Sequence, residues 1–229
     1  MKFLLSLFTE ISFFIYPSET IGWLVWFAFL VAILWFLWTV RKYNTPRKKI
    51  LRELLLAFLV ATPLAGFLLA LRLPAGAAQA LPGFPIMPAS GIILIFSALP
   101  WMLAGGYFGP LPGAFLATLM GVILGSYGNH SLFTPIIYGF LGAIFSLSLR
   151  QRFRTTAFRL LRRPIIAGFL LSLIYAVLFL LTSLFIINGS LPVRLDYVIS
   201  HLGGDSLAFS IQVLLGGAIL EAISIGYPK

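Results

Sequence analysis

The chain has 229 residues, of which 60% are hydrophobic, 15% are aromatic and only 10% are charged. Ordinary water-soluble domains carry charge on roughly a quarter of their residues, so this composition excludes that class and predicts a membrane protein. The sequence holds no cysteine, which excludes disulfides, thiolate catalysis and Cys-ligated metal centres.

Two basic clusters account for most of the formal net charge of +10. Lys and Arg gather in the cytoplasmic loops of membrane proteins, so these clusters predict a membrane topology and no nucleic-acid partner. The first cluster consists of Arg41, Lys42, Arg47, Lys48, Lys49 and Arg52, and the second of Arg150, Arg152, Arg154, Arg159, Arg162 and Arg163.

Residues 1–20 are predicted to form an interfacial segment that lies on the membrane surface. Its apolar stretch, which we expect to be helical up to Tyr16, is interrupted by polar residues such as Thr9 and Glu10. It is therefore too short and too polar to cross the bilayer. The following residues, 21–229, are predicted to form a single transmembrane domain.

Seven stretches of that domain approach the roughly 20 apolar residues that a helix needs to cross about 30 Å of hydrocarbon. Four of them lie between the two basic clusters, an even number, so both clusters fall on one side of the membrane. The positive-inside rule then places the N-terminus outside and Lys229 in the cytoplasm, across a bacterial inner membrane. The sequence therefore predicts an all-α, polytopic helix bundle, N-out and C-in, with spans at about 22–40, 54–72, 91–108, 111–127, 132–149, 164–187 and 206–225.

Two of the loops have a character of their own. Segment 73–90 contains four prolines, which make it stiff and non-helical, and it is predicted to be re-entrant or to cap the bundle. Segment 188–205 carries Leu195, Val198 and Leu202 at helical spacing. It is predicted to form a short amphipathic helix on the outer surface.

Small residues recur at every fourth position along the stretch 111–127, a pattern that lets two membrane helices approach closely. Glycines and prolines just before this stretch predict a sharp turn between two spans. Close helix packing is the favoured interpretation, and a glycine-lined ligand cleft is the alternative. The glycines concerned are Gly105, Gly106, Gly109, Gly113, Gly121 and Gly125.

Ionisable groups inside a bilayer cost at least about 2.5–3.5 kcal/mol at mid-depth, so each of them needs a reason. Glu221, near the cytoplasmic end of the last span, either reaches the interface to pair with a basic residue or serves as a coupling carboxylate. No nucleotide-binding, hydrolase or metalloprotease motif occurs, and His130, His201, Asp196 and Asp205 lack the spacing of metal ligands. We therefore expect no catalysis, no metal and no cofactor.

A set of polar residues is predicted to share the outer side of the membrane. Such a set suits an anionic or zwitterionic small molecule, or a pH sensor that titrates near neutrality. The alternative is that these are ordinary loop residues, with the Arg72 side chain reaching lipid headgroups. The candidate ligand-binding residues are Arg72, Asn129, His130, Arg194, Asp196 and His201, and Asp205 falls on the same side.

Residues 86–152 contain the pattern L-A-G-G-x-F-G-P-x-x-G, followed by a glycine-rich span and by P-x-x-Y-x-x-x-G. This stretch resembles the multi-span sensory input domains of bacterial signalling proteins, of the kind found in LytS-type receptors. It is also similar to the substrate-binding S-components of energy-coupling-factor vitamin transporters. The residues that match are Gly105, Gly106, Gly109, Pro110 and Gly113.

The first resemblance implies an input module that passes a signal to a cytoplasmic effector domain or to a second copy in a homodimer. Seven spans favour it over S-components, which usually have six, and place Lys229 where a linker to an effector would begin. We expect a small-molecule ligand to bind from the outer side under segment 73–90 and the last span to shift. A vitamin-type transporter subunit and a purely structural membrane anchor are the alternatives.

Overall fold

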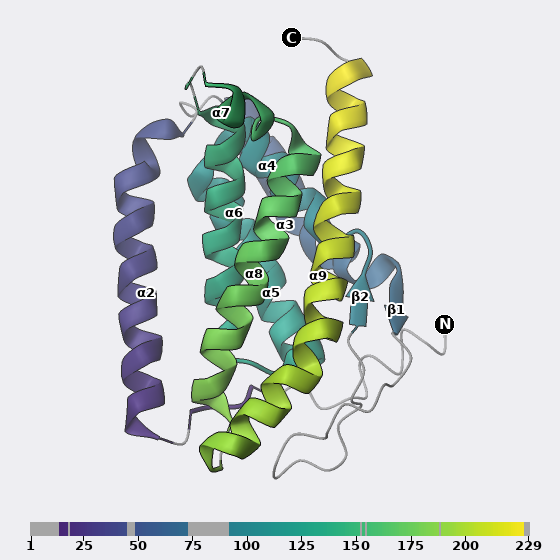
Figure 1. Cartoon of the computed structure of the whole chain (residues 1–229). Coiled ribbons are helices and arrows are strands. Elements are labelled where there is room, and N and C mark those ends of the chain that lie inside the picture. The colour runs from purple at the N-terminus through teal and green to yellow at the C-terminus, as the bar shows by residue number, and fades with distance from the viewer. Residues whose placement is uncertain are drawn as a thin grey trace.

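The computed structural model describes residues 14–17, 19–44, 49–72, 92–151, 153, 155–187 and 189–226. Almost all of this part of the chain is helical, and the long helices run side by side in one bundle (Figure 1). The elements in chain order are α2 (Thr20–Val40), η1 (Arg41–Tyr43), α3 (Lys49–Leu68), β1 (Ala70–Arg72), β2 (Ile92–Leu94), α4 (Ala98–Phe108), α5 (Pro110–Leu124), η2 (Gly125–Asn129), α6 (Thr134–Arg150), α7 (Thr156–Leu160), α8 (Pro164–Ile186) and α9 (Leu191–Gly226).

Three helical stretches of the described chain are long and apolar enough to cross a membrane, namely Thr20–Tyr43, Pro164–Ile186 and Leu191–Ile225. Shorter apolar helices occupy Glu53–Gly66, Pro110–Leu124 and Thr134–Arg150. Large apolar side chains stand on the outer faces of the bundle, among them Trp35, which is 71% exposed, and Ile199, which is 68% exposed. Lipid solvates such faces, so the structure is compatible with a membrane protein.

Helices α4, α5 and α6 pack closely because small residues face one another where they meet. A Cβ added at Gly113 would lie 2.8 Å from the Gly105 Cα, and one added at Gly142 would lie 2.7 Å from the Gly113 carbonyl oxygen. Backbones that approach so closely gain the van der Waals contact that holds helices together in lipid. Trp101 and Phe145 fill the centre of the three helices, with ring centroids 5.9 Å apart.

Side chains of α6 cap the C-terminal end of α4. The last four carbonyls of a helix have no partner within the helix, and hydrocarbon offers none. Ser146 Oγ donates to the Gly105 carbonyl at 2.6 Å. Arg150 donates from Nε to the Gly106 carbonyl at 3.3 Å and from Nη2 to the Tyr107 carbonyl at 2.6 Å. Two residues one turn apart on α6 therefore close the end of α4.

The described residues of the two basic clusters lie at the same end of the bundle, which we name the basic end. Arg150 Nη1 donates to the Tyr43 carbonyl at 2.8 Å. This bond joins the second cluster to η1, which contains Arg41 and Lys42 of the first. Figure 1 shows α7 and the C-terminal end of α9 at this end as well. Helices α3 to α6, which lie between the two clusters along the chain, thus return it to the end from which α3 starts.

Two of the predicted spans are shorter as helices than expected. The helix within the predicted span 54–72 ends at Leu68 and is followed by β1. The predicted span 91–108 opens with β2, which pairs antiparallel with β1, so α4 begins only at Ala98. The 11 residues of α4 rise only about 17 Å. The strand pairing satisfies backbone groups that an apolar environment would otherwise leave without partners.

The predicted outer loop 188–205 and the predicted span 206–225 are largely one continuous helix, α9, which has 36 residues. Gly203 and Gly204 lie at the predicted boundary, and each costs about 1 kcal/mol relative to alanine within a helix. Leaving several backbone groups unbonded in an apolar setting costs more, so the helix continues through them. Figure 1 shows the N-terminal part of α9 running obliquely and the rest running along α8.

The predicted interfacial helix is not helical at its described end. Residues 14–17 form no helix, and the backbone N–H of the buried Ile15 donates to the His130 carbonyl at 2.8 Å. The apolar Ile15 side chain is buried against the bundle. Residues 1–13 of the interfacial segment, and the whole predicted re-entrant segment 73–90, lie outside the described residues.

Candidate functional site

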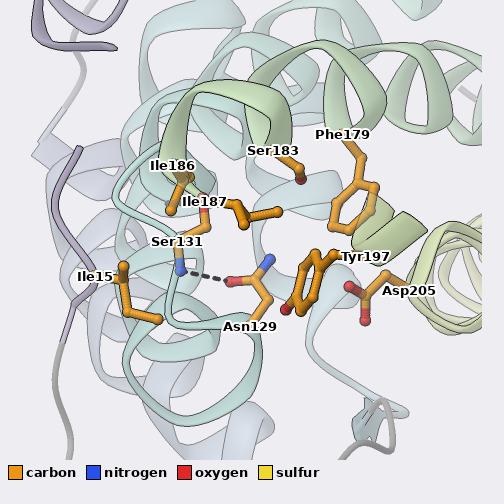
Figure 2. A pocket seen from close by; sticks show the side chains of 9 residues that line it. All are labelled: Ile15, Asn129, Ser131, Phe179, Ser183, Ile186, Ile187, Tyr197 and Asp205. Carbon is orange, nitrogen blue, oxygen red and sulfur yellow. Dashed lines mark hydrogen bonds between the residues drawn. The ribbon is translucent and has the colours of Figure 1, made fainter. Parts of the chain in front are cut away.

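A pocket lies at the end of the bundle opposite the basic end. Its walls come from the segment that joins η2 to α6, from the C-terminal half of α8 and from the N-terminal part of α9 (Figure 2). Its empty space is about 310 Å³, part of it open to the outside. Apolar side chains and a few polar groups converge on it, an arrangement typical of small-molecule sites. The lining residues are Ile15, Asn129, Ser131, Phe179, Ser183, Ile186, Ile187, Tyr197 and Asp205.

An irregular continuation of α5 builds the first wall. The helix passes into the π-helix η2, and π-turns occur often at functional sites. His130 then takes a left-handed conformation with a φ of 52°, which turns the chain toward α6. Asn129 Oδ1 accepts hydrogen bonds from the Ser131 backbone N–H at 3.2 Å and from Thr134 Oγ1 at 2.8 Å. These bonds fix the Asn129 amide at the pocket wall.

The α9 wall carries Tyr197, His201 and Asp205 at intervals of four residues, which puts them on one side of the helix. Tyr197 and Asp205 line the pocket. His201 stacks on the Tyr197 ring with centroids 4.0 Å apart, and its Nδ1 lies 3.0 Å from the Tyr197 carbonyl oxygen. The histidine therefore supports a lining residue rather than lining the pocket itself.

A buried aromatic cluster adjoins the pocket. Tyr175 and Phe209 stack with centroids 4.2 Å apart, and Tyr138 meets Phe209 edge-on at 5.4 Å. The Tyr138 hydroxyl donates to Gln212 Oε1 at 3.5 Å. The cluster thus keeps its rings buried beside the pocket.

Asp205 is the one Asp, Glu, Lys, Arg or His among the described lining residues. Within the described ranges of the chain, its carboxylate forms no hydrogen bond or ion pair. Arg194, on the same helix, pairs instead with Glu19 and also donates from Nε to the Gly189 carbonyl at 2.8 Å. The acceptor capacity of Asp205 is therefore available to a molecule in the pocket.

The structure places the predicted ligand-binding residues at separate points. Asn129 is the one member of this set among the described lining residues of the pocket. The others are His130, whose carbonyl bonds Ile15; Arg194, which is paired with Glu19; the exposed Asp196; His201, which stacks on Tyr197; and Arg72, which ends β1. The predicted set is dispersed, and the pocket is built mainly from other residues.

The predicted packing glycines and the predicted coupling residue lie elsewhere in the bundle. Gly109, with a φ of +115°, makes the turn between α4 and α5. A Cβ at Gly121 would lie 2.7 Å from the Pro135 Cα, one at Gly125 would lie 2.6 Å from Phe14, and Gly106 is less tightly enclosed. Glu221 lies toward the basic end of α9, and its buried Oε2 has no hydrogen-bond partner among the described residues.

Sequence reasoning missed most of the lining residues, although a signal was present. One stripe, on α8, consists of Tyr175, Phe179 and Ser183, which follow one another at intervals of four residues. On α9, Tyr197 and Asp205 are eight residues apart, which is twice that interval. Aromatic and polar side chains that follow the same interval on two neighbouring helices predict that both helices line one pocket. The predicted break between residues 205 and 206 concealed the second stripe.

The site combines a carboxylate, an amide, hydroxyls and aromatic rings, a set suited to non-covalent recognition of a small molecule. Across the described ranges, no group of three or more His, Cys, Asp and Glu side chains is placed to hold a metal ion. No family model matches the chain, and neither does any curated protein or solved structure.

Proposed function

We propose that the chain is a ligand-binding module of a bacterial inner membrane and that it serves as the sensory input of a signalling protein. The pocket at the end opposite the basic clusters carries the proposal. A few convergent polar groups in a mainly apolar hollow are the usual marks of a small-molecule site. With the basic end in the cytoplasm, as positive charge favours, the pocket opens toward the outer side.

Helix α9 supports a sensory role because it reaches from the pocket to the basic end. Along this helix, the stretch from the pocket residue Tyr197 to Glu221 rises about 36 Å. Toward the basic end it is tightly apposed to α8, since a Cβ at Gly217 would lie 2.9 Å from the Pro164 carbonyl oxygen. A ligand that moves α9 against α8 at the pocket would pivot the helix about this contact and displace its cytoplasmic end.

The proposed orientation predicts which residues a membrane-impermeant maleimide reaches in intact cells. The chain has no native cysteine, so single substitutions at the exposed Ser190 and Thr155 give one reactive thiol each. We expect Ser190→Cys to react in intact cells and Thr155→Cys to react only after permeabilisation. The reverse pattern would place the pocket in the cytoplasm and overturn the proposed direction of sensing.

Ligand binding predicts a stabilised protein whose response depends on the pocket. We expect at least one compound of a library of amines, organic acids, amino acids, nucleobases and vitamins to raise the Tm of the purified protein. A ligand at 100 times its Kd stabilises by about 2.7 kcal/mol. Ser183→Leu, which fills the pocket from the buried side of α8, should abolish the response, while the lipid-facing Leu181→Phe should keep it. Hits that survive Ser183→Leu bind elsewhere and count against the site.

A fluorophore at the cytoplasmic end of α9 separates the sensor from the transporter subunit. We expect any hit to change the fluorescence of a label at Ser224→Cys and to leave a label at Thr39→Cys, at the end of the peripheral α2, unchanged. Binding without a change at Ser224 would favour the alternative, a vitamin-type transporter subunit. Copurification with an ATPase partner would then support that alternative.

A further inference from the structure

The ligand's chemical class follows from the charge and the rings of the pocket, and this inference rests on the proposed function. We infer that the pocket selects a small organic cation, a primary or methylated ammonium held between the Asp205 carboxylate and the faces of neighbouring aromatic rings. The set of polar residues in the sequence suggested an anionic or zwitterionic ligand. The described residues that the fold gathers around the pocket include one acid and no base, which favours a cation instead.

The described lining of the pocket holds one acidic side chain and no basic one. Asp205 is that acid, and the other described lining residues are neutral. Arg194, the one Lys or Arg of α9, is held by Glu19 and by the carbonyls of Gly189 and Leu184. An anion would therefore meet an unscreened carboxylate in an apolar hollow, whereas a cation would supply the counter-charge that Asp205 lacks.

The rings around Asp205 complete a site for an ammonium group. Figure 2 shows the rings of Tyr197 and Phe179, the Asn129 amide and the Asp205 carboxylate turned toward one space. Tyr175 and Phe179 lie next to each other on α8 with centroids 6.1 Å apart. Aromatic faces attract cations through their quadrupole, most strongly where water is excluded, and aromatic groups with a carboxylate recognise alkylated ammonium ions.

The dimensions of the pocket limit the ligand to a small one. Part of its empty space of about 310 Å³ is open to the outside, so the enclosed part is smaller than that. Ile15, Ile186 and Ile187 form an apolar wall on which an alkyl chain can lie. The geometry thus points to an ammonium head with a short apolar body, and the Ser183 hydroxyl is available to a polar substituent.

The test uses three probes of equal chain length and different charge: n-butylammonium, n-butanol and butyrate. They are titrated by calorimetry into the full chain in lipid nanodiscs, up to about 10 mM, which fills a site of millimolar Kd. We expect n-butylammonium to bind more tightly than the other two. Asp205→Asn should weaken n-butylammonium about 10- to 100-fold. Glu53→Gln, an exposed acid on α3, should leave its affinity unchanged.

A second variant guards against a folding defect in Asp205→Asn. Phe179→Leu keeps the pocket apolar but removes one ring, so it should weaken n-butylammonium several-fold and n-butanol hardly at all. The cation inference would be overturned if butyrate or n-butanol bound as tightly as n-butylammonium, if Ser183→Leu abolished that binding and if Asp205→Asn did not change it. The pocket would then still be a binding site. Failure of every probe to bind also overturns the inference, and the library screen then decides on the proposed function separately.

Discussion

Replacing Gly113 by alanine is expected to lower the free energy of unfolding by about 2–3 kcal/mol, because the added methyl group has no room. Its Cβ would lie 2.8 Å from the Gly105 Cα and 3.4 Å from the Gly142 carbonyl oxygen. Both neighbours are backbone atoms, so no side chain can rotate away, and α4, α5 and α6 must separate together. The measurement is an SDS titration of the purified protein in mixed micelles, followed by circular dichroism.

The matched control is Gly204→Ala on α9. Gly204 is also helical, but a Cβ there meets no atom within 4 Å. Alanine is favoured over glycine within a helix by about 1 kcal/mol, so this variant should be as stable as the original chain or more so. Equal behaviour of the two variants would show that helix propensity, and not the close contact of α4 with α5, decides the outcome at Gly113.

Most helix positions could be predicted because apolar length and helix signals agree along much of the chain. The predicted span 164–187 corresponds to α8, which has Pro164 in its first turn, and 132–149 corresponds to α6, which starts at Thr134 and ends at Arg150. Proline suits the first turn of a helix, where its missing N–H leaves no bond unmade. These signals are local, so the positions of the two helices can be predicted without knowledge of their tertiary contacts.

The short helix α4 and the two strands could not be predicted in the same way. Residues 92–94 are as apolar as a span, and their strand conformation depends on pairing with residues 70–72. The partner of a strand is set by tertiary contact, which hydropathy along the chain does not contain. The hydrogen bonds that close the C-terminal end of α4 likewise come from Ser146 and Arg150, which are about 40 residues further along the chain.

The candidate site could be predicted only in part, for a related reason. Asn129 attracted attention as a polar residue between two spans, and it does line the pocket. Tyr197 and Asp205 face the same pocket because α9 continues without a break past the predicted boundary between residues 205 and 206. The ion pair of Arg194 with Glu19 joins residues far apart in the sequence. The sequence does not show that ion pair, so Arg194 is predicted from the sequence as a residue that binds an anionic group.

Removal of the Arg150 guanidinium is expected to destabilise the fold to a similar extent, because three backbone carbonyls lose their donor at once. Arg150→Met keeps the length and apolar stem of the side chain but leaves the carbonyls of Tyr43, Gly106 and Tyr107 without it. Hydrogen bonds to charged groups contribute about 1.5–3 kcal/mol each, and water at the half-buried site replaces part of them. We expect a net loss of about 2–4 kcal/mol in the same SDS titration.

Arg162→Met is the matched control, because Arg162 belongs to the same basic cluster, is exposed and donates to the Phe153 carbonyl at 2.9 Å. Its loss should cost no more than about 1 kcal/mol. Arg150→Lys should fall between the two, since an ammonium keeps the charge near the C-terminal end of α4 but cannot reach three carbonyls with one planar group. If Arg150→Met were no worse than Arg162→Met, the basic end would be held by charge and lipid alone. The second cluster would then mark topology without fastening α4, α6 and η1 together.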